Sequence, residues 1–261
     1  MKKFIFALFV GLLGVSLSAN ETLRVGATPV PAAVMLEFAK PILKEKGIDL
    51  IVQNFTDYIT PNLTLAKGDS DANLYQHKPF LDFTNKKNGW NLISLGRIYI
   101  TPMGFYSINH KSFEDFPVGA SIAVPNDPSN YSRALLFLAE HGFIKVKDQN
   151  NLQTTEFDII ENPKRIVFRQ VEAATLPKIY KGVDGAVITG NYALQAGIDI
   201  AKDSLFHEDT DSLYTNILAT RPELENDPRI ATLKEVLTSD AMKEFVAQKY
   251  GGSIFVVTPK N

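Results

Sequence analysis

The sequence predicts an α/β protein built from two lobes. Short apolar strands alternate with helical patterns along most of the chain, which favours mostly parallel sheets covered by helices on both faces. The alternation restarts after Phe105, and the chain returns to its first lobe near residue 213. Two passages between the lobes make a hinge, and a cleft between lobes is a common place for a ligand.

The first 19 residues are typical of a signal peptide rather than of a folded element. Lys2 and Lys3 precede the apolar run 4–15, which is too short to span a bilayer comfortably. Small residues follow, so we expect cleavage after Ser18 or Ala19 and export to the periplasm. The sequence contains no cysteine. We therefore expect no disulfide, no lipid anchor through an N-terminal cysteine, and a soluble product.

Charge and composition argue against several classes of function. The formal net charge is −2, and acidic and basic residues are interspersed without a basic stripe, so nucleic acid is not an expected partner. No cofactor is expected, because the sequence contains no glycine-rich phosphate loop and no dinucleotide motif. The histidines lack the spacing of metal ligands, and no metal is expected. They are His77, His110, His141 and His207.

The first lobe is expected at residues 20–104 plus 213–261. Its predicted strands are 22–27, 48–55 and 91–100, and its predicted helices are 31–46, 61–67 and 78–87. Proline opens the first of these helices and glycine follows each of them, as is usual at helix ends. Pro41 lies inside the first helix and is expected to kink or split it.

The second lobe is expected at residues 105–212. Its predicted strands are 120–124, 156–160, 166–171 and 185–188. Its predicted helices are 128–141 and 173–180, with a start at Pro177 as the alternative for the second helix. The chain then returns through a strand at 214–220 and ends in one long helix at 228–249. Asp-Pro opens that helix and Gly251-Gly252 closes it.

The segment 71–79 carries rings and amides close together. If it is extended, Asn73, Tyr75 and His77 share one face and Gln76 points to the other, because side chains alternate along a strand. A face with an aromatic ring, an imidazole and an amide suits a small amphiphilic ligand. The alternative is a half-buried strand with a polar end.

The segment 124–133 runs from a predicted strand end into a helix start. Asp127 can cap the helix, and the unpaired N–H groups of a helix start favour an anion. Arg133 lies within the first two turns, where its planar fork suits a carboxylate, and Asn130 can add an amide contact. The alternative is an ordinary capped helix with a surface arginine.

Further polar residues follow predicted strands or lie inside them. Thr189 and Asn191 come just after the strand 185–188, and Asn216 lies within the last predicted strand, where it needs a partner if buried. Together they offer donors and acceptors for a zwitterion, although each alone is more often structural. Glu208-Asp209 is expected to be a solvated loop. No nucleophile–base pairing is evident, so we do not expect an enzyme.

Several of these stretches together resemble the NlpA/MetQ family of substrate-binding proteins of methionine ABC importers. The matching stretches are Phe55-Thr-Asp-Tyr58-Ile-Thr-Pro-Asn62, Lys67 to Pro79, Val124 to Arg133, Glu161-Asn-Pro-Lys164 and Tyr214-Thr-Asn216. The resemblance implies a two-lobed, type II-like periplasmic-binding-protein fold with two α/β domains joined by a two-strand hinge. It also implies capture of L-methionine and delivery to an inner-membrane ABC permease.

The resemblance implies a role for each candidate residue. Arg133 and Asn130 would hold the α-carboxylate of the ligand. Asn216, Thr189 and Asn191 would serve the ammonium and the other polar contacts. The rings that would line the thioether pocket are Tyr58, Tyr75, His77 and Tyr99.

Two departures from the family pattern bear on these implications. Members are commonly lipoproteins, whereas this sequence has no cysteine. The family often has Asn where this chain has Thr189, which leaves three alternatives open: another amino acid as ligand, a methionine-containing dipeptide, or a surface interaction protein without a transport role.

Overall fold

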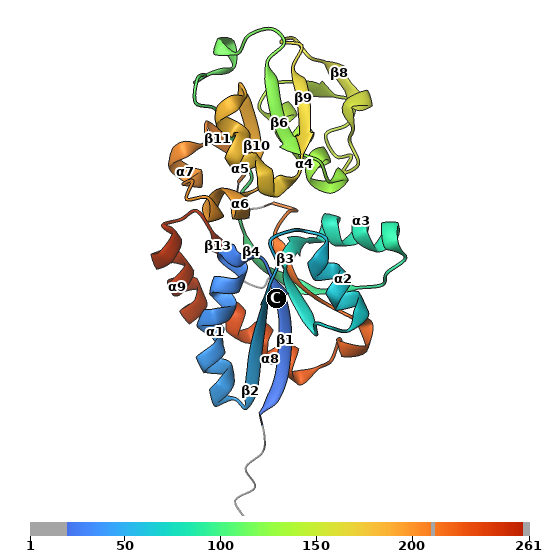
Figure 1. Ribbon diagram of the computed structural model, residues 1–261, viewed down its shortest axis with the longest axis vertical. Helices are drawn as coiled ribbons and strands as arrows, with labels where there is room; N and C mark the ends of the chain where they lie inside the picture. The colour runs from blue at the N-terminus through green and yellow to red at the C-terminus, as the bar shows by residue number, and fades with distance from the viewer. Residues whose placement is uncertain (1–19, 210–211, 258–261) are drawn as a thin grey trace, which may run out of the picture.

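The computed structural model describes residues 20–209 and 212–257. Two lobes lie one above the other along the long axis of the molecule (Figure 1). The lower lobe holds the N-terminal elements and the red C-terminal helices, and the upper lobe holds the middle of the chain. The predicted signal peptide lies outside the described residues. No helix in the described part of the chain is long and apolar enough to cross a membrane.

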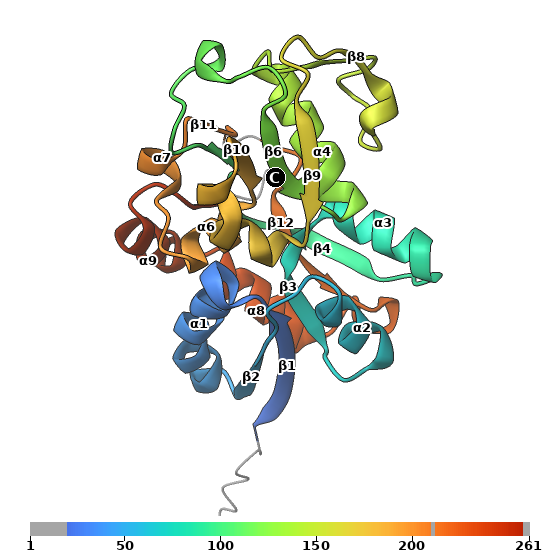
Figure 2. The ribbon, with the colours of Figure 1, turned by 45° about the horizontal axis from the view of Figure 1, so that its top comes forward.

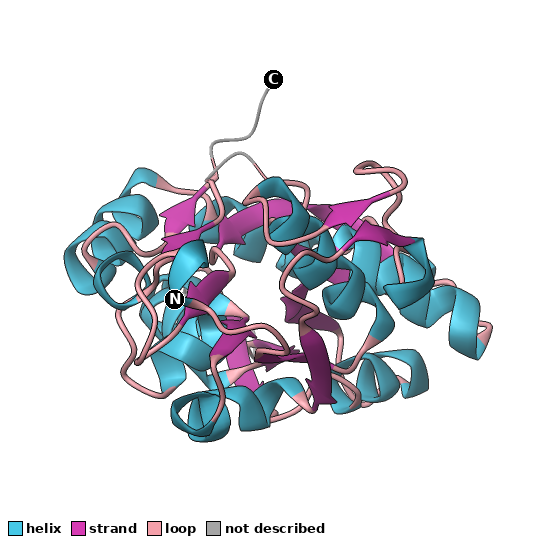
Figure 3. Ribbon diagram, turned by 90° about the horizontal axis from the view of Figure 1, so that it is seen from above, coloured by secondary structure: helices cyan, strands magenta, loops and turns pink. Residues whose placement is uncertain are grey.

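Within the described residues the lower lobe contains a six-stranded sheet of order β13-β4-β12-β3-β1-β2. Its strands are β1 (Glu21–Ala27), β2 (Ile48–Asn54), β3 (Ala72–His77), β4 (Ile93–Ile100), β12 (Asn216–Thr220) and β13 (Phe255–Val256). Its helices are α1 (Val34–Glu45), α2 (Thr60–Lys67), α3 (Lys78–Asn88), α8 (Pro228–Leu237) and α9 (Asp240–Tyr250). Seen from above, with the two lobes superposed, helices lie on both sides of the central strands (Figure 3).

Apolar packing covers both faces of this sheet. On one face, α1, α8 and α9 bury residues such as Leu36, Leu233 and Val246 against the strands. On the other face, Leu65 of α2 and Leu81 of α3 pack against the sheet. Such burial is the main favourable term in folding, at about 25 cal/mol per Å² of apolar surface.

The predicted mostly parallel arrangement is wrong for the lower sheet. β1 runs parallel to β2 and β3, whereas β12 pairs antiparallel with both β3 and β4. The cause is the chain returning from the upper lobe, because β12 enters between β3 and β4 from the opposite direction (Figure 2). The return of the chain to the lower lobe, which the sequence predicted, therefore makes this sheet mixed rather than mostly parallel.

Two predicted helices have different boundaries in the structure. Helix α1 continues through Pro41, and the irregular backbone lies earlier, in the π-helical turn Pro29–Ala33, where Val30 is extended. Buried residues on both sides of Pro41 hold one face of α1 on the sheet. The predicted helix 228–249 is two helices, because Ser239 lies between them in an extended conformation and caps α9 through the Met242 N–H.

The upper lobe contains, among the described residues, a five-stranded sheet of order β11-β5-β10-β6-β9. Its strands are β5 (Gly104–Tyr106), β6 (Ser121–Pro125), β9 (Val167–Val171), β10 (Gly185–Ile188) and β11 (Phe206–His207). Its helices are α4 (Pro128–Glu140), α5 (Leu176–Ile179), α6 (Gly190–Gln195) and α7 (Ile200–Asp203). The strands β6, β9 and β10 are parallel, while β5 and β11 are antiparallel to their neighbours.

The predicted strand 156–160 is mostly wrong. Residues Glu156–Asp158 form a 3₁₀ turn in which Asp158 and Thr155 make a capping box. The short strand β8 (Ile159–Glu161) follows and pairs only with β7 (Lys145–Val146), outside the main sheet. The local capping hydrogen bonds stabilise the turn more than the strand propensity of this segment stabilises an extended conformation.

The chain passes between the sheets twice. The first crossover, residues 101–103, joins β4 to β5, and the second joins β11 to β12. The lobe boundaries at 104/105 and 212/213 stay a prediction.

A bulge in β3 changes which side chains share a face. Ile217 pairs with Gln76 and Leu218 pairs with Leu74, so Tyr75 is an extra residue in the ladder. The predicted single face with Asn73, Tyr75 and His77 is therefore wrong, since Asn73 hydrogen-bonds to Gln76 instead. The half-buried alternative is also wrong, because every residue of β3 is buried.

Four buried polar side chains cross-link α2, β3 and α3. Asn62 Nδ2 donates to Gln76 Oε1 at 2.8 Å and to Thr84 Oγ1 at 3.0 Å. Asn62 Oδ1 accepts from Asn73 Nδ2 at 2.8 Å and from Gln76 Nε2 at 2.6 Å. The network fixes the end of β3 relative to the start of α2, next to His77 and Tyr58, which contact the upper lobe.

We expect Asn62→Ala to lower the free energy of unfolding by about 3 kcal/mol, because it leaves buried amide groups without partners. Urea unfolding measures this change. The control Asn150→Ala, at an exposed position in the upper lobe, should stay within about 0.5 kcal/mol of the wild type. An Asn62 variant as stable as the control would contradict the role of the network.

Candidate functional site

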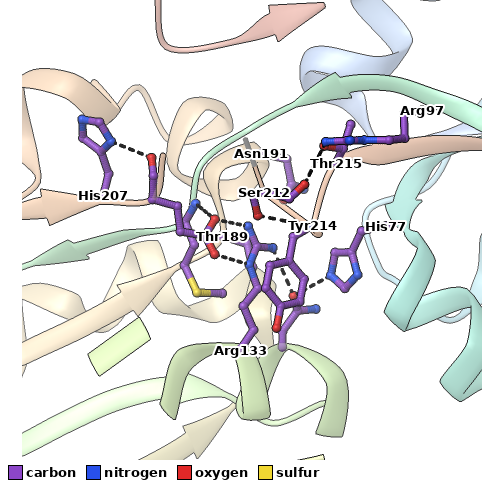
Figure 4. Close-up of polar contacts among 12 residues, drawn as sticks. His77, Arg97, Arg133, Thr189, Asn191, His207, Ser212, Tyr214 and Thr215 are labelled. Atoms are coloured by element: carbon purple, nitrogen blue, oxygen red, sulfur yellow. Dashed lines mark hydrogen bonds and ion pairs between the residues drawn. The ribbon is translucent and has the colours of Figure 1, made fainter. Parts of the chain in front are cut away.

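The start of α4 in the upper lobe meets the end of β3 in the lower lobe. Asp127 caps α4 by accepting from the Asn130 N–H at 2.9 Å, as predicted, and also accepts from the Asn130 side chain at 3.1 Å. These bonds turn Asn130 Oδ1 toward the lower lobe, where it lies 3.0 Å from His77 Nε2 (Figure 4). Burial raises the pKa of Asp127, and the Asn130 donors oppose this shift.

His77 is neutral in this arrangement. Its Nδ1 accepts from the Phe80 N–H at 3.2 Å and caps α3, so the proton is assigned to Nε2, which donates to Asn130. Burial, together with the positive charge of Arg133, lowers the pKa of His77 to about 3, and the hydrogen bond to Asn130 only partly opposes this shift.

Arg133 points into the interface rather than into solvent. It is 4% exposed, and its Nε donates to Glu208 Oε1 at 2.7 Å while Nη2 donates to Oε2. The Tyr214 ring covers the guanidinium carbon at 4.4 Å, and Nη1 lies 3.5 Å from Asn130 Oδ1. Burial acts to lower the pKa of Arg133, but the Glu208 carboxylate outweighs burial, and the pKa is raised.

These contacts overturn two sequence-based interpretations. The alternative of a surface arginine is wrong, because Arg133 is buried and paired. The solvated loop expected at Glu208-Asp209 is wrong for Glu208, whose side chain is only 9% exposed. A buried guanidinium needs a counter-charge, and Glu208 supplies it.

A second group of polar contacts joins the lobes at Tyr58. Its hydroxyl lies 3.0 Å from Thr189 Oγ1 and donates to Asn191 Oδ1 at 2.5 Å. Nearby, the Tyr192 hydroxyl donates to the Thr56 carbonyl at 2.9 Å, again between lobes. Burial raises the pKa of Tyr58, so the phenol stays protonated.

Aromatic rings of the lower lobe gather around Tyr58. Its ring centroid is 6.0 Å from that of Tyr75 and 5.9 Å from that of Phe80. The Tyr192 ring of the upper lobe lies 5.0 Å away. The Tyr75 hydroxyl donates to the Tyr58 carbonyl at 3.1 Å. Rings from both lobes thus meet beside the polar contacts.

The remaining predicted residues lie at the edges of this region. Asn216 opens β12 and pairs with His77 on one side and with Tyr99 on the other. Tyr99 belongs to the apolar core of the lower lobe. Asn191 Nδ2 is buried and has no hydrogen-bond partner among the described residues.

Sequence reasoning missed several residues that the structure places here. Glu208 and Tyr214 both contact Arg133, and Tyr192 and Phe80 contact Tyr58. Tyr214 and Tyr192 lie in stretches already singled out, so their aromatic character was an available signal. Glu208 gave no local signal, because its partner lies 75 residues away in the sequence.

Two mixed α/β lobes, two crossovers and a buried polar and aromatic site between the lobes define a two-lobed substrate-binding protein. No group of three or more potential metal ligands occurs in the parts of the chain that the structure covers.

The chain belongs to the NlpA lipoprotein family, whose profile matches residues 23–257. It is 36% identical to membrane lipoprotein TpN32 of Treponema pallidum, over 95% of this chain and 92% of that protein. It is 40% identical to the probable D-methionine-binding lipoprotein MetQ of Pasteurella multocida, over 90% of this chain and 86% of that one. The resemblance predicted from the motifs is confirmed.

Solved structures agree with this assignment. A nutrient-binding protein of Burkholderia cenocepacia bound to methionine is 39% identical, with a TM-score of 0.86 over 90% of this chain and 99% of that one. A periplasmic substrate-binding protein of an ABC transporter from Coxiella burnetii is 36% identical, with a TM-score of 0.86 over 90% and 100%. These relatives are described as binding proteins rather than enzymes, and the predicted two-lobed fold is confirmed.

We expect acid to destabilise the protein partly through His77. Because its pKa is lowered on folding, the unfolded chain binds the proton first, and the unfolding free energy falls as the pH drops from about 6.5 towards about 3. Between pH 7 and 4 this group contributes a loss on the order of 3 kcal/mol.

Urea unfolding of the wild type and His77→Gln at both pH values measures this contribution. The variant should lose less stability on acidification than the wild type. Asn150→Ala, at an exposed position without a titratable side chain, is the control and should keep the pH dependence of the wild type. An equal loss in the wild type and His77→Gln would contradict a neutral, buried His77.

Proposed function

We propose that this protein binds methionine between its lobes and delivers it to an ABC permease of the inner membrane. Two of the relatives named above are described as methionine-binding or bound to methionine, and a third as part of an ABC transporter, which supports this ligand and this partner. The observation that carries the proposal is a buried, pre-oriented guanidinium at the lobe interface, flanked by amides and rings.

Arg133 is the proposed partner of the α-carboxylate. Glu208 occupies the edge formed by Nε and Nη2, which leaves the edge formed by Nη1 and the second Nη2 hydrogen. That edge has the same two-donor geometry that suits a carboxylate. Asn130 Oδ1 accepts from Nη1 at 3.5 Å, so Asn130 lies beside this edge; as the proposed second contact it would donate to the ligand carboxylate through Nδ2, which bonds to Asp127 in this structure.

The other polar groups complete the proposed contacts to a zwitterion. The unpartnered Asn191 Nδ2 is a donor and suits a carboxylate oxygen. Asn216 is the proposed acceptor for the ammonium through its side-chain carbonyl, and Thr189 adds a hydroxyl that can serve either group. All three side chains are buried.

The rings of Tyr58, Tyr75, His77 and Tyr99 are the proposed lining for the methionine side chain. Thioether sulfur makes favourable contacts with aromatic ring edges. Since His77 is neutral and the phenols stay protonated, these rings present no net charge to the side chain. An uncharged lining suits an apolar thioether.

Closure around the ligand is the proposed mechanism of capture. Tyr58, Tyr192 and His77 each hydrogen-bond across the interface, so the closed arrangement has favourable contacts of its own. A ligand that contacts both lobes adds free energy to the closed state alone and shifts the population toward it.

A different ligand is the second candidate, and Thr189 favours it. The Thr189 hydroxyl bonds to Tyr58, and threonine is shorter than the asparagine common in the family. The space gained suits a methionine-containing dipeptide or another amino acid. We further propose a periplasmic location, on the basis of the signal-like residues 1–19.

Calorimetry on purified protein, stripped of co-purified ligand, tests the proposal. The titration panel contains L-methionine, D-methionine, methionyl dipeptides and the other standard amino acids. Methionine of at least one configuration should bind with the highest affinity. If a dipeptide binds tighter than both enantiomers, the second candidate is correct; if nothing in the panel binds, both are wrong.

We expect Arg133→Lys to weaken methionine binding by about 100-fold or more, because an ammonium cannot present two parallel donors to a carboxylate while also satisfying Glu208. Calorimetry measures the change. Arg229→Lys is the matched control, since Arg229 also pairs with a carboxylate but lies in α8 and contacts none of the proposed ligand-binding residues. Near-normal affinity in Arg133→Lys would mean that the carboxylate binds elsewhere.

We expect Tyr58→Phe to weaken methionine binding by about tenfold, mainly through faster dissociation, because the change removes both hydroxyl contacts that hold the lobes together. Stopped-flow fluorescence measures the rates. Tyr106→Phe is the control, because the Tyr106 hydroxyl is buried without a partner among the described residues. Equal dissociation rates in the two variants would refute this role of Tyr58.

A further inference from the structure

Glu208 connects the proposed ligand site with both crossovers between the lobes. It follows β11 at the start of the second crossover, and its N–H donates to the Met103 carbonyl in the first crossover at 2.9 Å. Its side-chain Oε2 accepts from the Met103 N–H, also at 2.9 Å. Through the same carboxylate it holds Arg133 of α4.

The second crossover contacts Arg133 again near its other end. The Tyr214 ring stacks on the guanidinium at 4.4 Å. Arg97 of β4 anchors the neighbouring residues, with Nη2 donating to the Ser212 carbonyl at 3.0 Å and to Thr215 Oγ1 at 2.6 Å (Figure 4). The guanidinium is therefore held between two parts of the same crossover.

We propose that Glu208 is a permanent positioning residue. It stays bonded to one edge of Arg133 and orients the other edge toward the ligand carboxylate, and its bonds to Met103 make this orientation depend on the position of the crossovers. This inference rests on the proposed function. The rival interpretation is a placeholder, in which Glu208 occupies the guanidinium only until the ligand carboxylate displaces it.

The contacts of Glu208 favour a permanent role. Displacing it would leave the buried Met103 N–H without its side-chain acceptor and a largely buried carboxylate without a counter-charge, and both changes are costly. The ligand has no need to displace it, because Nη1 on the opposite edge of Arg133 makes only the 3.5 Å bond to Asn130 Oδ1. Glu208 and the ligand then bind the two edges of one guanidinium.

The test compares L-methionine with L-methioninamide, which lacks the carboxylate, in the wild type and in Glu208→Asp. Aspartate keeps the charge but is one methylene too short to reach Arg133 and Met103 together. We expect the preference for methionine over the amide to fall about tenfold, since one charge-assisted contact is lost or misaligned. A placeholder predicts the opposite, a stronger preference, because the guanidinium would be released.

Asp227→Asn is the matched control. Asp227 pairs with Arg229 through Oδ2 at 2.5 Å and caps α8, in the lower lobe. Asp227→Asn should lower the melting temperature and leave the preference for methionine over the amide unchanged. This control separates a loss of stability from a change in the orientation of Arg133. Glu208→Gln is a second variant with the wild-type side-chain length; its amide donors face the guanidinium donors, so the preference should also fall.

A measurement on the wild type needs no substitution. The Arg133 Nε–H signal in ¹H–¹⁵N NMR spectra should stay protected from solvent exchange before and after methionine is added, because Glu208 keeps that edge. Loss of protection on binding, or an unchanged or increased preference in a folded Glu208 variant, would overturn the inference. Wild-type protein that binds methionine and its amide equally would instead refute the carboxylate role of Arg133.

Discussion

The buried ion pair between Arg133 and Glu208 is the constraint on which the site depends. A guanidinium at 4% exposure is costly unless a carboxylate or several hydrogen bonds compensate its charge. Glu208 does so from a different segment of the chain, and Asp127 and Asn130 orient the neighbouring groups. The start of α4 therefore cannot change its position without also moving the crossovers.

The topology explains why the ion pair lies where the lobes meet. The chain leaves the lower lobe after β4 and returns to it as β12, which inserts between β3 and β4. Both crossovers consequently pass close to the carboxyl end of β3, which carries His77. Residues distant in sequence meet at this point, and the lobes contact one another through His77, Tyr58 and Tyr192.

The sequence predicted most elements of the fold, because their signals are local. Proline and glycine residues at the helix ends predicted the bounds of α2, α3 and α4 to within one or two residues. The apolar run 185–188 forms a strand with the predicted bounds. The prediction of a mostly parallel lower sheet failed, because the direction of β12 depends on the chain that returns from the upper lobe. The prediction of which residues share a face of β3 failed, because the bulge at Tyr75 depends on the register with β12. The burial of Glu208 was not predicted, because its partner Arg133 is distant in sequence.

The charges at the interface also restrict the kind of ligand that the closed site can accept. Arg133 and Glu208 already balance one another, His77 is neutral and the tyrosines stay protonated, and Asp127 adds a further buried carboxyl group nearby. A carboxylate on the free edge of Arg133 would place two anions around one cation in a buried site, which is unfavourable without another positive charge. A zwitterion brings that charge in its own ammonium group. A thioether acid without the ammonium would not, so the ion pair that orients the guanidinium also favours an amino acid over a simple carboxylic acid.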